Sequence, residues 1–269
     1  MVLVFDVGAT HIRAALAEHG KFSDVVRLNT DSEAAGFASF LGVIEEMSKG
    51  KRLSAVAGCM PGQLEGDEGH LALAPNLPNW VGLPVGARIK RLFDCQVSVL
   101  NDVELCGLGE AFAGAGTMHG VTVYVTVSTG VNAVRILNGK IDPSIRQFEL
   151  GKLLISAKGG RPESLETLIG GASLEYRRHL EPRMIHDPAV WKHEAQDLAK
   201  GLYDIMLAWT PDIVVFGGGM MKDIDLAAVR AELEQLPRAL SDLPHLERAK
   251  LGDLGGLHGA LVWLGQAKR

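Results

Sequence analysis

The chain has 269 residues, of which 47% are hydrophobic and 22% charged, so it can form one large domain or two modest ones. This apolar content excludes intrinsic disorder, because enough surface can be buried to offset the entropy of the chain. The net charge of -5, without a long run of like charge, disfavours nucleic acid as a partner. Neither a signal peptide nor a membrane span is recognisable, so we expect a cytoplasmic protein with no membrane partner.

The three cysteines, Cys59, Cys95 and Cys106, are odd in number, widely spaced and set in apolar segments. A disulfide framework or a metal-binding cysteine cluster would space them differently. Their pattern therefore predicts free thiols in a reducing compartment.

Two segments, 2–16 and 121–136, share one pattern. Each has a β-branched run, a small-residue turn with Gly and Thr, and a second apolar run, which together predict a β-hairpin. We interpret the chain as a duplicated unit; the alternative is two unrelated hairpins.

Strands and helices alternate over the rest of the chain, which predicts an α/β fold. The expected strands are 53–59, 96–100 and 211–216. The expected helices are 37–47, 165–180, 188–207 with Asp187 as N-cap, and 255–264. No low-complexity linker separates the halves, so we expect two closely packed lobes with a cleft between them.

The first hairpin turn contains Asp6, Gly8 and Thr10. Gly lets backbone N–H groups approach an oxyanion, Thr adds a hydroxyl donor, and Asp can hold a hydrated cation. This is the chemistry of a phosphate cradle. The alternative is an ordinary tight turn that Asp6 caps.

Two further turns follow strands. Ser128-Thr129-Gly130 offers small groups that can bond phosphate oxygens, and Gly217-Gly218-Gly219 offers a flat surface for an adenine or ribose. The three turns together predict a bound nucleotide.

A strand ends at Asn101-Asp102, directly before an expected helix. Asp102 is either a helix N-cap or a general base that accepts the proton of an attacking hydroxyl, with Asn101 holding a neighbouring hydroxyl. The Pro-flanked loop around Asn76 offers amides suited to a polyhydroxylated ligand, while Trp80 is expected in the core. Glu149 and Glu166, taken alone, are solvated or capping carboxylates.

The ordered set of these motifs resembles the ROK family of sugar kinases, open reading frames and repressors. The resemblance spans nearly the whole chain, from Asp6-Val7-Gly8-Ala9-Thr10 to the 251–260 segment. It implies the fold of the sugar kinase, Hsp70 and actin superfamily: an α/β protein of two duplicated, ribonuclease H-like lobes. We place the smaller lobe at 1–106 plus 252–269 and the larger at 107–251.

The resemblance also implies roles. Asp102 matches the catalytic base, and Asn76, Asn101, Glu149 and Glu166 match sugar-binding positions. The phosphate and adenosine positions of ATP match Asp6, Gly8, Thr10, Thr129, Gly130, Gly218 and Gly219. Asp6 also matches the carboxylate associated with Mg²⁺, directly or through water. Members are often dimers, so a homodimer is one state open to this chain.

Three departures from the family pattern stand out. Lys152 replaces a His after the Glu149 motif, and no cysteine lies between Glu149 and Glu166, so no zinc site is expected. Asn132 replaces a Gly of the second phosphate motif; the tolerance of Asn for positive φ would preserve the turn, while the close approach of the backbone to phosphate would be weakened. Lys152 either changes which sugar is accepted or points to solvent.

These observations predict an ATP- and Mg²⁺-dependent kinase of a hexose or hexosamine, acting on the 6-hydroxyl in the manner of a glucokinase. The alternative, motivated by Asn132 and Lys152, is a sugar sensor or degenerate kinase that transfers little phosphate. The repressor branch of the family is disfavoured, because the first hairpin begins at residue 2 and leaves no room before it for a helix-turn-helix.

Overall fold

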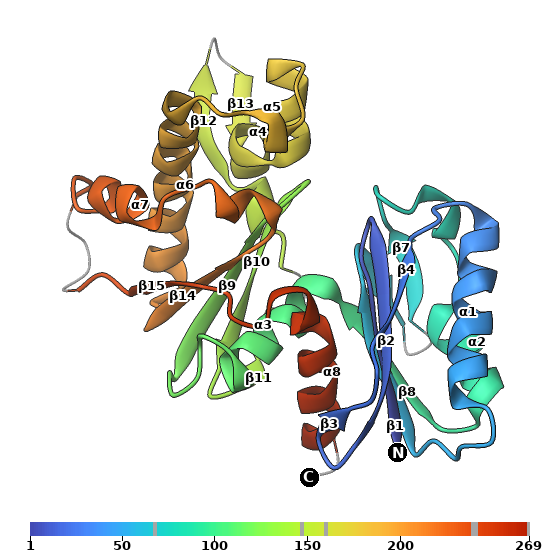
Figure 1. Cartoon of the computed structure of the whole chain (residues 1–269). Helices are drawn as coiled ribbons and strands as arrows, with labels where there is room; N and C mark the ends of the chain where they lie inside the picture. Colours follow the sequence, from blue (N-terminus) through green and yellow to red (C-terminus); the bar gives the residue numbers. More distant parts are fainter. Residues whose placement is uncertain (67–68, 146–147, 159–160, 238–241, 268–269) are drawn as a thin grey trace. The chain divides into compact units, whose positions relative to one another are not determined.

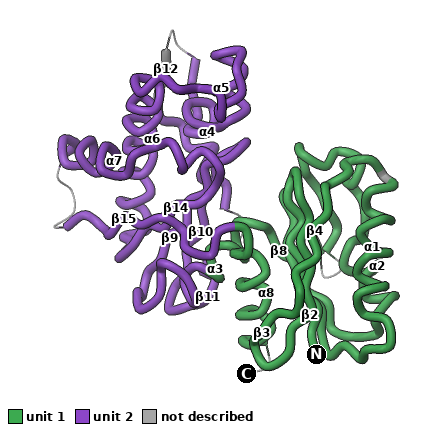
Figure 2. Tube along the Cα trace, in the orientation of Figure 1, with its two compact units in different colours: residues 1–109, 253–269 green, residues 110–252 purple. Residues whose placement is uncertain are grey.

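Two units make up the chain, and they are coloured separately in Figure 2. A computed structural model describes residues 1–66, 69–145, 148–158, 161–237 and 242–267. Unit 1 comprises residues 1–109 and 253–269, and unit 2 comprises residues 110–252. The chain leaves unit 1 within helix α3 (Asp102–Ala113) and returns to it after Gly252.

The sheet of unit 1 has the order β3-β2-β1-β5-β8, with β4 also paired to β2. Its strands are β1 (Val2–Val7), β2 (His11–Glu18), β3 (Lys21–Phe22), β4 (Val26–Asn29), β5 (Ala55–Met60) and β8 (Gln96–Asn101). β1 and β2 form the predicted antiparallel hairpin, with Val7 opposite Ile12. β1, β5 and β8 are parallel, so their carboxyl ends meet at one edge of the sheet.

Helices cover both faces of this sheet (Figure 1). Helices α1 (Ala34–Ser48) and α2 (Val85–Phe93) cover one face, and α8 (Gly255–Gln266) packs on β1 and β5 from the other. Aromatic rings fill the α1 side: Phe5 meets Phe40 at 5.1 Å between ring centroids, and Phe37 meets Trp80 at the same distance. Trp80 is fully buried, which confirms its predicted place in the core. The hairpin β6 (Gln63–Glu65) and β7 (His70–Leu73) and the turn η1 (Pro78–Trp80) complete this side.

Unit 2 repeats the topology of unit 1. Its main sheet has the order β11-β10-β9-β14-β15, again a hairpin followed by two parallel strands. The strands are β9 (Val121–Val127), β10 (Val131–Leu137), β11 (Lys140–Ile141), β14 (Ile213–Gly217) and β15 (His245–Arg248). The second predicted hairpin and the interpretation of the chain as a duplicated unit are therefore confirmed.

The helices of unit 2 correct one expectation. Residues 165–180 form two helices, α4 (Leu165–Ile169) and α5 (Gly171–Arg178), because Gly170 takes an extended backbone with ψ 140°. α6 (Pro188–Trp209) begins as predicted: Asp187 accepts a hydrogen bond from the Ala189 N–H at 2.9 Å. The remaining elements are η2 (Leu150–Lys152), β12 (Leu154–Lys158), β13 (Arg161–Ser164), η3 (Pro182–Met184), η4 (Gly219–Lys222), α7 (Leu226–Leu233) and η5 (Gly252–Leu254).

Some of the candidate site residues in each unit lie where parallel strands end. In unit 1, Asp6 lies near the end of β1 and Asn101 ends β8. In unit 2, Val127 ends β9 and Gly217 ends β14. Over the described residues, no helix is both long enough and apolar enough to cross a bilayer.

Candidate active site

Asp102 is the first residue of α3, at the carboxyl edge of the unit 1 sheet. The Asn101 side chain caps this helix: its Oδ1 accepts from the Val103 N–H at 2.8 Å, and Glu104 Oε2 accepts from the Asn101 N–H at 3.3 Å. This is a reciprocal capping pair, so the cap does not depend on Asp102. Asp102 Oδ1 also accepts from Val103 N–H at 3.0 Å. The N–H of Asp102 itself also bonds this carboxyl, so the side chain is held at the start of the helix by two backbone donors.

The environment of Asp102 favours its neutral form. Burial, followed by the negative charge of Asp6, raises the pKa of Asp102 from 3.8 to about 7, against the lowering effect of the Val103 N–H. A carboxyl with a pKa near the working pH can take a proton from a hydroxyl and release it again. This is the protonation behaviour that general-base catalysis needs.

Gly62 connects Asn101 to the loop that carries Asn76. Asn101 Nδ2 donates to Gly62 O at 2.9 Å, and Gly62 has φ +111°. A Cβ at Gly62 would overlap the carbonyl oxygen of Leu73, so this loop and Gly62 touch through their backbones. Asn76 is exposed three residues after Leu73. Asn101 keeps one N–H and one lone pair for a ligand hydroxyl.

Asp6 is a buried carboxylate, 8% exposed, beside the start of α8. Cys59 Sγ donates to Asp6 Oδ1 at 3.3 Å, and Arg13 Nη1 lies 4.0 Å from Oδ2. Arg13 is itself held by Asp253, whose Oδ2 accepts from Nε at 3.1 Å. A Cβ at Gly256 would lie 2.8 Å from Asp6 Cγ, so only glycine fits there. Burial raises the pKa of Asp6, with Cys59 and Arg13 acting in the opposite direction.

These two carboxylates suit a divalent cation. Asp6 and Asp102 are desolvated and close enough for the charge of Asp6 to raise the pKa of Asp102, and Arg13, which also bonds Asp253, lies 4.0 Å from Asp6. Hard oxygen ligands with excess negative charge are what Mg²⁺ prefers, often through water. The described residues hold no group of three or more His, Cys, Asp or Glu side chains that could ligate a metal on its own.

The first hairpin turn uses part of its backbone internally. Gly8 N–H donates to His11 O at 2.9 Å, and Gly8 O accepts from the Thr30 hydroxyl at 2.7 Å. The Gly8 N–H is thus unavailable to a phosphate, and the exposed Thr10 is the donor that the turn presents. A Cβ at Gly8 would lie 3.0 Å from His11 O, which explains the glycine.

In unit 2, Glu166 lies against the second hairpin turn. Its Oε2 accepts from the Val131 N–H at 3.1 Å, and its Oε1 forms an ion pair with Lys152 Nζ. A Cβ at Gly130 would lie 2.6 Å from Glu166 Oε2, so Gly130 makes room for this carboxylate. Glu166 is therefore neither a solvated residue nor a simple cap. Lys152 pairs with Glu166 and is 62% exposed, so it does not simply point to solvent; its effect on which sugar is accepted stays a prediction.

The break between α4 and α5 docks on the same turn. Gly171 N–H donates to Ser128 O at 2.7 Å, and Ala172 N–H donates to Thr129 O at 3.0 Å. The side chain of Thr129 is exposed beyond these backbone contacts. These bonds explain why 165–180 does not form one helix: the N–H groups at the break pair with the turn.

Asn132 has a structural role that corrects the expectation of a positive φ. It lies in β10 and is absent from the described residues with left-handed backbone. Its Nδ2 donates to Phe148 O, and its Oδ1 accepts from the Leu150 N–H at 3.0 Å. The side chain thereby brackets Glu149, which is exposed.

In the turn Gly217–Gly219, the backbone passes close to a neighbouring strand. Gly218 has φ +92°, and a Cβ there would overlap Val127 O, so β14 and β9 touch at this point. A Cβ at Gly219 would meet nothing within 4 Å, which leaves an open surface above it. Gly218 and the Thr129–Gly130 turn therefore flank the same strand end in unit 2.

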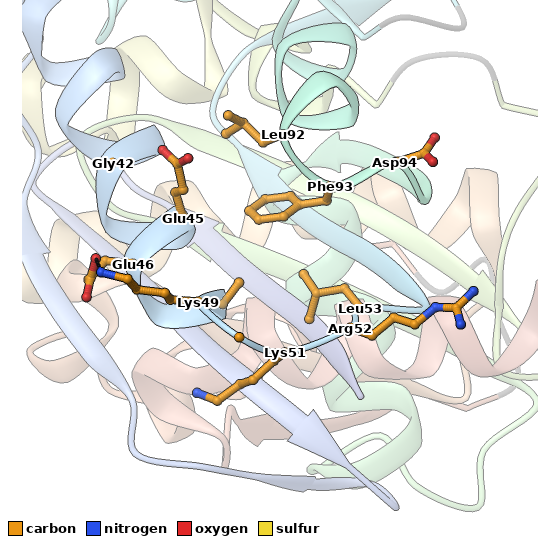
Figure 3. A pocket seen from close by; sticks show the side chains of 12 residues that line it. Gly42, Glu45, Glu46, Lys49, Lys51, Arg52, Leu53, Leu92, Phe93 and Asp94 are labelled. Atoms are coloured by element: carbon orange, nitrogen blue, oxygen red, sulfur yellow. Dashed lines mark ion pairs between the residues drawn. The ribbon is translucent and has the colours of Figure 1, made fainter.

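A pocket of about 790 Å³ in unit 1 (Figure 3) has none of these residues in its lining. The ends of α1 and α2 and the segment before β5 line it, including Glu45, Lys49, Arg52 and Phe93. Lys49 pairs with Glu46 at 3.5 Å across its rim. It sits at the amino ends of β5 and β8, opposite the edge that holds Asn101, so we do not assign the candidate site to it.

Two units with the same sheet order define a class, the actin-like ATPase fold of duplicated α/β units. Within that class the chain belongs to the ROK family, whose sequence profile matches residues 2–267.

Characterised relatives align over nearly the whole chain. N-acetyl-D-glucosamine kinase of Salmonella heidelberg is 26% identical, over 95% of this chain and 96% of the relative. A ROK hexokinase from Thermus thermophilus is 26% identical, with a TM-score of 0.80 over 100% of this chain and 99% of that one. A ROK glucokinase from Streptomyces griseus, solved with glucose and AMPPNP, is 20% identical with a TM-score of 0.77, over 96% of this chain and 97% of that one, and supports the fold.

Most of the candidate site residues in the two units were predicted from the sequence. The residues that hold them in place were not. The sequence predicts Cys59 only as a free thiol and includes Gly256 only in the matched 251–260 segment, so their contacts with Asp6, like that of Gly62 with Asn101, come from the structure. A Pro-Gly pair at 61–62 was the available signal for a forced turn. Cys59 and Gly256 carry no local signal, because their role depends on a partner 53 or more residues away.

Proposed function

We propose that this chain is an ATP- and Mg²⁺-dependent carbohydrate kinase that transfers the γ-phosphate to a hexose or hexosamine hydroxyl, the 6-hydroxyl as in a glucokinase. Membership of the ROK family and the relatives named as kinases support the kinase class. The observation that carries the mechanism is Asp102: a carboxyl at a helix start, at the carboxyl edge of the unit 1 sheet, with a pKa of about 7.

The transfer needs a proton acceptor. The hydroxyl oxygen bonds to the γ-phosphorus, its proton moves to Asp102, and the bond from the γ-phosphorus to the bridging oxygen breaks, so ADP leaves with that electron pair. Asn101 and Asn76 orient the sugar by hydrogen bonds to neighbouring hydroxyls, and Glu149 and Glu166 act as acceptors for others. Orienting the hydroxyl lowers the entropic cost of the reaction.

For the nucleotide, we assign phosphate contacts to Asp6, Gly8, Thr10, Thr129 and Gly130, and adenosine contacts to Gly218 and Gly219. The Gly8 N–H is already paired, so Gly8 contributes shape rather than a donor. Asp6 would hold Mg²⁺, directly or through water, and the ion would supply charge neutralisation at the β- and γ-phosphates.

One observation favours the sensor alternative. The N–H of Val131, at the second phosphate turn, already bonds Glu166 and is not offered to a phosphate. A protein with this turn could bind sugar and transfer little phosphate.

A panel of sugars distinguishes the kinase from the sensor. ADP release is measured with glucose, mannose, fructose, allose and the N-acetylhexosamines, and binding of each sugar is measured by calorimetry with and without ATP. A kinase releases ADP only with the sugars it binds. Binding of a sugar without sugar-dependent ADP release would exclude the kinase and favour the sensor.

A further inference from the structure

Helix α4 is too short to be stable without contacts to other elements. With five residues it leaves its last carbonyls without partners inside the helix, and a helix of this length is not stable in water. Arg177, on α5, fills this gap: its Nη1 donates to Thr167 O at 2.5 Å and its Nη2 donates to Leu168 O at 2.6 Å. One guanidinium thus caps the end of α4 with two charge-assisted hydrogen bonds.

A buried carboxylate anchors Arg177 in turn. Glu194 on α6 is 2% exposed, and its Oε1 accepts from Arg177 Nη2 at 3.1 Å. Its other oxygen, Oε2, is buried and without a hydrogen-bond partner among the described residues. Because a buried charge is costly unless it is paired, Glu194 depends on Arg177 for its ionised form.

The contact of Arg177 with α4 matters for the candidate site because α4 contains Glu166. Glu166 lies in its first turn, and the α4–α5 break bonds the Ser128–Thr129 backbone. The opposite side of α4 packs on α6 so closely that a Cβ at Gly201 would lie 2.6 Å from Leu165 Cδ1. A shift at the end of α4 would therefore move the Glu166 carboxylate.

We propose that the Arg177–Glu194 ion pair is a positioning device for sugar recognition: it fixes α4 on α6 and so sets where Glu166 presents its carboxylate. The inference rests on the proposed function in one respect, that Glu166 contacts the sugar. Neither Arg177 nor Glu194 is placed on the substrate.

The charges around Glu194 also make the device sensitive to pH. Burial raises the pKa of Glu194 to about 7, with Asp197 adding to the rise and Arg177 and Arg178 opposing it. Asp197 is itself bonded to Lys200 Nζ at 2.7 Å and lies 3.5 Å from His193 Nε2. Glu194 is thus ionised above pH 7, where the pair is complete, and neutral below it, where the pair weakens.

The test compares Arg177→Ala with Arg178→Ala, which removes the same charge one residue along α5. Amide hydrogen exchange at Gly170 and Val131, whose N–H groups bond Glu166, should accelerate about tenfold or more in the first variant only. The KM for the sugar should rise roughly 10- to 100-fold, with a smaller change in the KM for ATP. Arg177→Lys, which keeps the charge but not the two-pronged geometry, should fall between.

Glu194→Gln supplies a second readout. At pH 8 it should bind sugar as weakly as the unaltered chain does at pH 6, and its affinity should change less between those two pH values. Calorimetry in an Asp102→Asn background removes the titration of the proposed base from this comparison. Unchanged exchange in Arg177→Ala, or equal increases in both KM values, would overturn the inference. Faster exchange in a chain that shows no sugar-dependent ADP release would uphold the anchoring of α4 and remove the proposed function instead.

Discussion

Asp102 combines two properties that single residues rarely hold together: it is fixed by a helix start and yet remains able to change protonation state. Asn101 and Glu104 cap the N-terminus of α3, so the cap does not require the Asp102 side chain. Its pKa of about 7 comes from burial and from Asp6. Both features depend on neighbours, and the sequence alone left Asp102 as either a cap or a base.

The pKa of Asp102 predicts how activity depends on pH. As a base it must be ionised, so kcat/KM should fall by about tenfold per pH unit below its pKa of about 7 and level off above it. The measurement is kcat/KM between pH 5.5 and 8.5 in the unaltered chain and in Glu194→Gln, which removes the Glu194 carboxyl whose pKa is also raised to about 7. A flat profile in Glu194→Gln would contradict this role.

Among the elements, the most consequential contacts join short segments that have little stability of their own. Gly62 ties the Asn76 loop to Asn101, Asn132 ties β10 to the segment around Glu149, and the α4–α5 break ties Glu166 to the second turn. Each contact uses backbone groups, which fix position with less freedom than side chains do.

Gly62→Ala tests the first of these contacts. Its φ of +111° and the close Leu73 carbonyl should make the substitution cost more than Gly50→Ala, a control with φ +72° and nothing near its Cβ. We expect the free energy of unfolding, measured with denaturant, to fall by roughly 2–3 kcal/mol in Gly62→Ala and by about 1 kcal/mol in Gly50→Ala. The KM for the sugar should rise in Gly62→Ala alone. Equal losses of stability in both variants would show that the backbone contact is unimportant.

The elements also show what a sequence can and cannot predict. Both hairpins, the strand before Gly217 and the N-cap at Asp187 followed from local patterns, because alternation, glycine turns and capping residues act over a few positions. The break at Gly170 did not, because it is stabilised by Ser128, more than 40 residues earlier. The ion pairs of Lys152 with Glu166 and of Arg177 with Glu194 could not be predicted either, because each joins residues that are distant in the sequence.

Over the whole molecule, one sheet topology is used twice and the two copies carry different chemistry. Unit 1 contains Asp102, Asp6 and the amides of Asn76 and Asn101, and unit 2 contains Glu166, Glu149 and two glycine turns. In each unit, part of the set lies where parallel strands end: Asp6 and Asn101–Asp102 in unit 1, and the two glycine turns in unit 2. The repeated hairpin predicted the duplicated topology, because strand alternation and glycine turns are local patterns.

The central claim is that Asp102 accepts the proton of the sugar hydroxyl. Folding raises the pKa of Asp102 above its unfolded value of 3.8, so its ionised form lowers stability increasingly as the pH rises towards 7. Asp102→Asn removes that charge and should unfold at the same temperature as the unaltered chain, or higher, at pH 8. Loss of activity in this variant therefore cannot be attributed to unfolding.

The most direct measurement is sugar-dependent ADP release by Asp102→Asn at pH 8, with sugar affinity measured by calorimetry on the same preparation. We predict that kcat falls by roughly 10²- to 10⁴-fold while the Kd for the sugar changes by no more than a few-fold. Normal turnover by Asp102→Asn would contradict the account.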